Sequence, residues 1–151
     1  METQFDILEK LRAKAMQMVE GLSLEQLNRV PQGFNNNIIW NLGHLVAAMQ
    51  GVCYRRSNVP MRISEEFFQK YKPESRPEGD VSEQEVLDIR DLLNLTVDQL
   101  RRDYNQGLFE TYTAFTTRYG VDINNIEEAI TFLSFHEGMH MGYIMAQKRV
   151  V

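Results

Sequence analysis

The chain has 151 residues, 43% of them hydrophobic and 25% charged, which excludes general disorder and predicts a single globular domain over residues 1–151. A net charge of −5 without a basic tract argues against nucleic-acid binding. The N-terminal segment METQFDILEK does not resemble a signal peptide, the longest apolar run (Leu45–Met49) is too short to span a membrane, and one cysteine excludes an internal disulfide, so we expect a cytoplasmic protein.

The first half of the chain contains two amphipathic segments that are predicted to be helices. In residues 4–20, apolar side chains recur at spacings of three and four, and Gly21 is a typical helix stop. Ser23 and Gln26 form a capping-box pattern, which predicts a short helical piece. A second long helix is predicted over residues 37–55. The apolar positions of the two long helices are Phe5, Leu8, Leu11, Ala15 and Met18, then Ile38, Ile39, Leu42, Leu45, Val46, Met49, Val52 and Cys53.

Two more helices are predicted in the second half, after a long connection. Residues 56–81 hold three of the four prolines and are predicted to be this connection, with a short helix over residues 64–71. Helices follow over residues 83–104 and 125–147, with a second connection between them. Each begins with a capping pattern, Ser82 with Glu85 and Asn125 with Glu128. Four such helices and no strand-like alternation predict an all-α fold, a four-helix bundle with a long crossover connection.

The three histidines of the chain are placed where they can meet. In the last helix, His136 and His140 continue a stripe of core positions, so their rings lie on one face and can bind one ion. His44 can supply a third ligand from a facing helix. The alternative is a set of core histidines that only form hydrogen bonds. If a metal binds, the stabilisation it gives is expected to shrink below about pH 6.5, where unperturbed histidine is protonated.

The segment HEGMH, residues 136–140, matches the H-E-x-x-H signature of zinc proteases, in which the glutamate activates water. Such a protease needs a third ligand, and no His, Asp or Glu follows this segment. The longer metzincin pattern also fails, because Tyr143 and Ala146 stand where it requires Gly and His. Glu137 is the nearest candidate for a catalytic base, although it points about 100° away from His136 around the helix.

Four of the nine glycines fall inside the two histidine helices, although glycine costs up to about 1 kcal/mol relative to alanine in a helix interior. They are Gly43, Gly51, Gly138 and Gly142. We expect Gly51, which shares the face of His44, to leave space for a ligand. Gly138 and Gly142 are expected to permit close helix packing, within the subunit or across a dimer.

The segments NNNIIWNLGHLVAAMQ and IEEAITFLSFHEGMHMGYIM resemble the second-helix and last-helix motifs of the DinB-like (DinB/YfiT) superfamily, and their order and separation also fit. The resemblance covers nearly the whole chain. It implies a four-helix bundle, commonly dimeric, with a divalent metal held by His44, His136 and His140. All-histidine sites suit zinc or nickel, with iron or copper as alternatives. Characterised relatives include S-transferases that use bacillithiol, mycothiol or glutathione, and a maleylpyruvate isomerase.

Three functions remain open at this point. The first is a metal-dependent enzyme, a thiol-dependent S-transferase or a hydrolase, that acts on a small-molecule substrate, with a low-molecular-weight thiol as a candidate partner. The second is a non-enzymatic metal-binding or stress-related protein with a vestigial site. The third is a dimeric helical scaffold in which the histidines only form hydrogen bonds. The expected macromolecular partner is a second copy of the chain, with no nucleic acid and no membrane.

Overall fold

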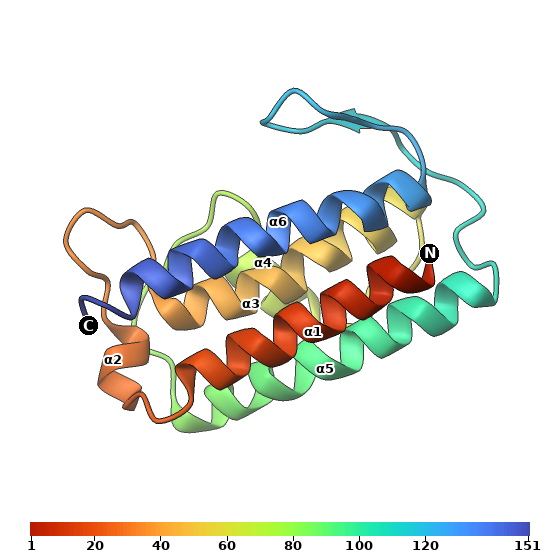
Figure 1. Ribbon diagram of the computed structural model, residues 1–151. Coiled ribbons are helices and arrows are strands. Elements are labelled where there is room, and N and C mark those ends of the chain that lie inside the picture. Colours follow the sequence, from red (N-terminus) through yellow and green to blue (C-terminus); the bar gives the residue numbers. More distant parts are fainter.

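Four long helices lie side by side in the structure, a computed structural model that describes residues 1–151 (Figure 1). They are α1 (Glu2–Val19), α3 (Ile38–Met49), α5 (Glu83–Asn105) and α6 (Ile126–Gln147). The colours of Figure 1 show that α3 and α5 begin at the same end of the bundle, so the chain crosses back along the bundle between them. The predicted all-α bundle with its long crossover is therefore confirmed. None of the helices has the length and apolar character needed to cross a membrane.

Short polar side chains fix where five of the helices begin, three of them at the predicted caps Ser23, Ser82 and Asn125, and Asn37 caps α3. Each N-cap side chain accepts a hydrogen bond from a backbone N–H in the first turn, which satisfies a donor that the helix leaves unpaired. The caps are Ser23 before α2 (Leu24–Asn28), Asn37 before α3, Ser64 before α4 (Glu65–Tyr71), Ser82 before α5 and Asn125 before α6. The Glu85 side chain, predicted to complete a capping box, instead accepts from Lys70 and Tyr71 and so ties the crossover to α5.

The α3 helix lies at the centre of the molecule, and all twelve of its residues are buried. It packs against α5, α6, α4 and α2. The predicted apolar stripe covers too small a part of this helix. Because α3 is apolar nearly all round, its neighbours cover it on every side. The α-helix also ends earlier than predicted, and the chain continues as a π-helical turn, Gln50–Tyr54, and a 3-10 turn, Arg55–Ser57.

The core face of α1 contains a charged residue that the apolar pattern did not predict. Its buried residues are Phe5, Leu8, Arg12, Ala15 and Val19. Leu11 and Met18, which were predicted for this face, are only partly buried. The predicted stripe is therefore confirmed at Phe5, Leu8 and Ala15. It is wrong at Leu11 and Met18, and a buried cation takes a core position instead. Arg12 is tolerated there because its guanidinium is paired and hydrogen-bonded throughout.

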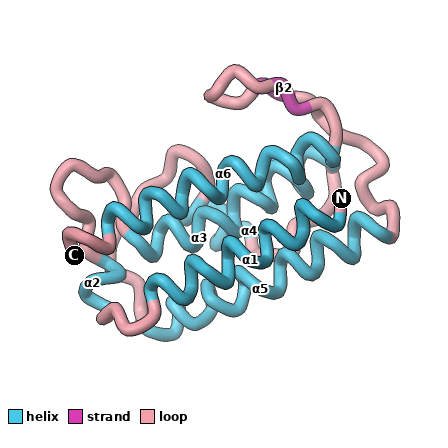
Figure 2. The backbone as a smooth tube through the Cα atoms, in the orientation of Figure 1, coloured by secondary structure: helices cyan, strands magenta, loops and turns pink.

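The connection between α5 and α6 contains a small hairpin that the sequence analysis did not predict. Strand β1 (Phe115–Thr116) pairs antiparallel with β2 (Asp122–Ile123), with Phe115 opposite Ile123. Figure 2 shows the hairpin standing out from the bundle and bending back over α6. Strands of two residues are too short to produce the alternation by which a strand is identified in a sequence.

Candidate metal centre

The three histidines of α3 and α6 meet between these two helices. The ring centroids of His44 and His136 lie 5.3 Å apart, those of His44 and His140 4.7 Å, and those of His136 and His140 4.6 Å. One ring nitrogen from each residue lies within 4.8 Å of the other two. His44 and His140 are buried and His136 is partly buried. The convergence predicted from the i,i+4 pair and the facing helix is thus present.

The crossover helix fixes the orientation of His44. The backbone carbonyl of Tyr71, the last residue of α4, lies 2.7 Å from His44 Nδ1. A carbonyl only accepts, so Nδ1 carries the proton and Nε2 keeps its lone pair for a ligand. Carbonyls in the last turn of a helix have no partner within that helix, which makes the end of α4 a ready acceptor.

A buried amide network fixes His140 in the same way. His140 Nδ1 lies 2.7 Å from Asn41 Oδ1. The Asn41 amide cannot be flipped, because its Nδ2 donates to the carbonyl of Asn37 at 2.8 Å and to Gln147 Oε1 at 3.2 Å. Oδ1 is therefore the acceptor, His140 Nδ1 is the donor, and His140 Nε2 keeps its lone pair. Hydrogen bonds of this kind orient metal-binding imidazoles and raise their basicity.

His136 differs from the other two histidines. Its Nδ1 is buried and has no hydrogen-bond partner. A buried polar atom left unpaired costs about 1–3 kcal/mol. The ring is held by apolar contacts instead, with Phe132 one turn earlier on α6 and a ring separation of 6.2 Å. His136 therefore lacks the hydrogen bond that fixes each of the other two rings.

Trp40 covers the outer side of His44. The two rings are stacked, with centroids 4.6 Å apart and an angle of 11° between their planes. The Trp40 indole N–H donates to Ser75 Oγ in the crossover at 3.1 Å. The single tryptophan of the chain is thus fixed against one of the candidate ligands, and its fluorescence is a natural reporter on this site.

Burial keeps all three imidazoles neutral at neutral pH. It is the main cause that lowers the pKa of His44 to about 4, that of His136 to about 3 and that of His140 to about 2. The charge that a neighbouring imidazole would carry adds to the effect at His136 and His140, and Arg118 lowers the pKa of all three. No carboxylate acts in the opposite sense. Neutral imidazole is the form that binds metals.

Glu137, the predicted base, does not join this group. Its side chain is fully buried on another face of α6, where Oε1 accepts from Arg12 Nε at 2.9 Å and Arg12 Nη2 at 2.7 Å. The physical reason is the turn of about 100° per residue, which directs Glu137 toward α1 while His136 faces α3. The proposed base role therefore has no support in the geometry, and the carboxylate belongs to a buried ion pair.

Gly43 of α3 and Gly51 of the π-helical turn that follows it both face the crossover. A Cβ at Gly43 would lie 2.6 Å from the Tyr71 ring, so only glycine lets Tyr71 approach α3 this closely. This approach brings the Tyr71 carbonyl to His44. A Cβ at Gly51 would lie 3.2 Å from Phe68 of α4. Gly51 does line a cavity, of about 400 Å³, together with Phe68. None of the three histidines lines this cavity, so the expected ligand space beside His44 is not found there.

The donor set fits a divalent metal ion. Three neutral imidazoles, two of them fixed with Nε2 free, leave at least one coordination position open for a small molecule. Nitrogen donors of this kind suit zinc, nickel, copper or iron.

The sequence analysis did not identify Asn41, Gln147 or Tyr71 as supporting residues. For Asn41 a signal was available, since it is a polar residue in an otherwise apolar stretch of a buried helix. For Gln147 there was little signal, because it ends α6 and is followed by Lys148 and Arg149. For Tyr71 there was none, because its contribution is a backbone carbonyl.

Comparison with known proteins supports the resemblance seen in the two histidine motifs. No curated protein matches the chain significantly. Residues 7–144 match the family model of the DinB superfamily, and this range includes both histidine-bearing helices. The chain therefore belongs to the DinB superfamily.

Proposed function

We propose that the protein is a metal-dependent enzyme that holds one divalent ion with His44, His136 and His140. The observation that carries the proposal is the meeting of three neutral imidazoles within 4.8 Å, two of them fixed as ligands by Tyr71 and Asn41. Zinc and nickel are the metals we favour, with iron and copper as alternatives. The reaction we favour is transfer or hydrolysis on a small molecule, with a low-molecular-weight thiol as the candidate co-substrate.

In the proposed function, the chain contributes the three imidazole ligands and the ring of Trp40, and the ion supplies the reactivity. A divalent ion at such a site supplies Lewis acidity, which lowers the pKa of a water or a thiol. The imidazoles supply three neutral ligands, and Trp40 covers one side of His44. The scaffold alternative, in which the histidines only form hydrogen bonds, is disfavoured by the unpaired Nδ1 of His136.

The first test is metal content. Untagged protein is purified, and its zinc, nickel, iron and copper are measured by elemental analysis, with titration of the apo protein followed by Trp40 fluorescence. We expect about one ion per chain, and none in His140→Ala. Asn28→Ala is the matched control, because Asn28 is a buried polar residue whose amide binds Val81 away from the histidines. Full stoichiometry in His140→Ala would contradict the site assignment.

The second test separates an enzyme from a metal-binding protein with a vestigial site. Metal-loaded protein is screened with bacillithiol, mycothiol and glutathione against a set of electrophiles, and with ester and amide substrates for hydrolysis. Turnover that disappears in His140→Ala supports the enzyme. A loaded protein that is inactive in every combination supports the non-enzymatic alternative.

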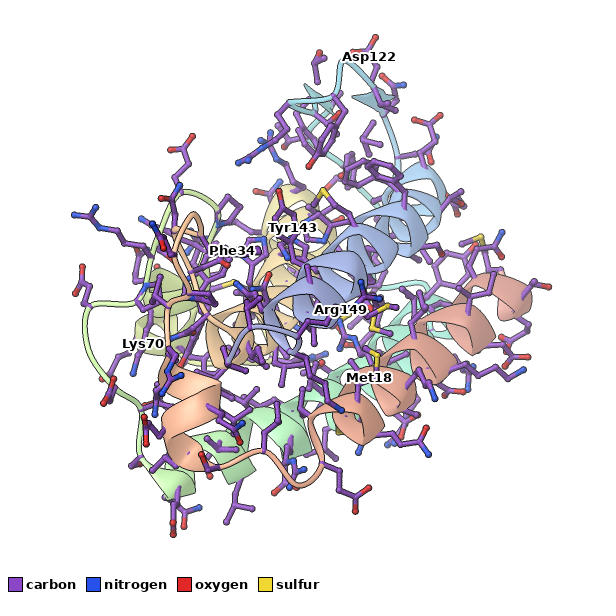
Figure 3. The ribbon with its side chains drawn as sticks, turned by 60° about the vertical axis from the view of Figure 1, so that its left-hand side comes forward. Met18, Phe34, Lys70, Asp122, Tyr143 and Arg149 are labelled. Carbon is purple, nitrogen blue, oxygen red and sulfur yellow. The ribbon has the colours of Figure 1, made fainter.

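We also propose that the chain forms a homodimer through the exposed face of α6. Between Ala129 and Gln147 the helix carries one charged residue, Glu137, and that residue is buried. The exposed side is apolar, with Phe135 54% and Met145 47% exposed. Figure 3 shows Tyr143 on this side, where it meets Phe34 of the loop before α3, with ring centroids 6.4 Å apart.

The test of the dimer uses a glycine on this face. A Cβ at Gly142 meets nothing within 4 Å, so Gly142→Glu and Gly142→Ala both fit the monomer. Sedimentation at micromolar concentration is expected to show a dimer for the wild type and Gly142→Ala, and a monomer for Gly142→Glu. A wild-type protein that sediments only as a 17.6 kDa monomer would contradict the proposal.

A further inference from the structure

The tip of the hairpin between α5 and α6 is a well-defined turn. The Gly120 N–H donates to the Thr117 carbonyl at 3.0 Å, and the Thr117 N–H donates to the Val121 carbonyl at 2.8 Å. The Val121 N–H also donates to Thr117 Oγ1 at 3.1 Å. Gly120 adopts a φ of +75°, which glycine accepts without strain. Arg118 and Tyr119 are therefore held as the two central residues of a hydrogen-bonded turn.

Tyr119 attaches this turn to the part of α6 that carries the histidines. Its hydroxyl lies 2.8 Å from Met139 Sδ, and its ring meets Phe135 edge-on with centroids 5.2 Å apart. Met139 directly precedes His140, and Phe135 directly precedes His136. The hairpin therefore bends back onto the two turns of α6 that supply two of the three candidate ligands, as its course in Figure 1 also shows.

Arg118 directly precedes Tyr119, so the contacts of Tyr119 with Met139 and Phe135 also place the backbone of Arg118 near the histidine-bearing turns of α6. Its charge acts on His44, His136 and His140 alike, whereas Arg12, the other arginine that acts here, affects His136 alone and is paired with Glu137. The Arg118 side chain is exposed and forms no hydrogen bond or ion pair within the chain. A guanidinium beside a cation site is unfavourable by itself. An anionic group bound between the ion and Arg118 would be attracted by both.

We propose that Arg118 binds an anionic group, a carboxylate or a phosphate, of the small molecule that reaches the histidine centre. The planar guanidinium matches either group with two parallel hydrogen bonds. The turn fixes the backbone of Arg118, and Tyr119 fixes the turn, so the point from which the arginine side chain extends is set before the molecule arrives. This inference rests on the proposed function in that the metal centre defines where the molecule reacts, and it adds the chemical class of that molecule.

The experiment separates metal binding from anion binding. Apo protein is first titrated with Co²⁺ alone, followed by visible absorption and Trp40 fluorescence, which tests the proposed function. The loaded protein is then titrated with acetate and with inorganic phosphate at constant ionic strength, with chloride as the reference anion. Wild type is compared with Arg118→Gln and Arg118→Lys. Arg102→Gln, an exposed position on α5, is the matched control for the loss of one charge.

We expect Arg118→Gln to bind acetate or phosphate at least about tenfold more weakly than wild type, since a charge-assisted pair is lost. The anion affinity of Arg118→Lys is expected to be intermediate, because lysine keeps the charge but cannot form the two parallel hydrogen bonds of a guanidinium. Arg118→Gln should bind Co²⁺ with unchanged stoichiometry and about two- to fourfold more tightly, since a repelling charge is removed. The anion that loses more affinity identifies the group, carboxylate or phosphate.

Equal anion affinity in wild type and Arg118→Gln would overturn the role of Arg118. So would a spectral response of the wild type to acetate and phosphate that is no larger than its response to chloride. Uptake of no Co²⁺ by the wild type would instead overturn the proposed function. In that case the same anions are titrated into the apo protein with Trp40 fluorescence, since Arg118 is present without the ion. The same loss in Arg118→Gln would then support the anion site alone, and no loss would reject it.

Discussion

Two buried polar clusters lie on neighbouring faces of α6 and are built in opposite ways. Glu137 meets Arg12 of α1, so opposite charges neutralise each other within the chain. Arg12 also donates to the carbonyls of Leu93 and Leu45, which leaves its guanidinium fully used. One residue earlier, His136 enters a cluster of three like groups with no acid and with an unpaired Nδ1. Glu137 Oε2 is buried without a partner as well, so an unpaired atom alone does not separate the two clusters. They differ in charge, because the ion pair contains its own counter-charge, whereas the histidine cluster holds three like groups and no acid. Structural and functional burial of polar groups can be distinguished by this difference.

The largest expected effect is on the ion pair. Glu137→Ala leaves the Arg12 charge buried and uncompensated, which typically costs about 3–5 kcal/mol of unfolding free energy. The double variant Arg12→Met/Glu137→Leu removes both charges and is expected to recover most of this loss. Urea denaturation measures the free energy of unfolding of the wild type, Glu137→Ala and the double variant. If the double variant is no more stable than Glu137→Ala, the cost does not come from the unpaired charge.

A third variant, Glu137→Gln, sharpens the contrast with the histidine cluster. Glu137→Gln is expected to lose stability and to keep one metal ion per chain, because Glu137 faces α1 and not the ligands. A Glu137→Gln protein of unchanged stability that has lost turnover would reverse this assignment and restore the carboxylate as a catalytic base.

The second effect is the pH dependence of the apo protein. The folded imidazoles have lowered pKa values of about 4, 3 and 2, whereas unfolded histidine takes up a proton near pH 6.5. The unfolded chain therefore binds more protons below pH 6.5, and the free energy of unfolding falls as the pH falls from 6.5 toward 4. By pH 5 the loss is about 2 kcal/mol for each histidine. Urea denaturation from pH 8 to 5 measures it, and the fall should be about 2 kcal/mol smaller in His136→Gln.

These pKa values also change what is expected of added metal. The sequence predicts that stabilisation by metal shrinks below pH 6.5, but the folded ligands stay neutral to about pH 4. A hundredfold excess of metal over its dissociation constant should then add about 2.7 kcal/mol throughout pH 5–8, or about 5–11 °C in Tm. Thermal melts with and without zinc measure the gain, which should be absent in His140→Ala. A gain that declines from pH 6.5 would show that the imidazoles titrate normally in the folded chain.

A smaller effect is expected from the amide that orients His140. Asn41→Ala removes the acceptor for His140 Nδ1 and should weaken metal binding about 10–100-fold without changing its stoichiometry. Asn28→Ala, the buried asparagine that binds Val81, should lower stability and leave metal affinity unchanged. Competition titration against a chromophoric chelator measures both. Equal losses of affinity would mean that general destabilisation, and not orientation of the ring, weakens the site.

The sequence predicts the histidine cluster well because its geometry follows from local rules. An i,i+4 spacing places His136 and His140 on one face whatever surrounds the helix, and a bundle supplies a facing helix for His44. Arg12 was missed because an apolar pattern treats a charge as a surface residue, and only the fold reveals the Glu137 partner. The hairpin and Arg118 were missed because two-residue strands leave no periodic signal. Contacts that depend on one tertiary arrangement therefore escape a sequence analysis, while contacts set by helical repeat do not.

The smallest expected effect concerns the glycine that lets the crossover reach His44. Gly43→Ala places a methyl group 2.6 Å from the Tyr71 ring, and the strain, offset by better helix propensity, leaves a net loss of about 1 kcal/mol. The ring must move, and the Tyr71 carbonyl that fixes His44 moves with it, so metal affinity should fall as well. Gly142→Ala on α6 is the matched control, because nothing lies within 4 Å of its Cβ and the variant should gain up to about 1 kcal/mol. Urea denaturation and metal titration of both variants measure these changes. Unchanged metal affinity in Gly43→Ala would mean that His44 holds its orientation without Tyr71, and that the crossover only covers the histidine cluster.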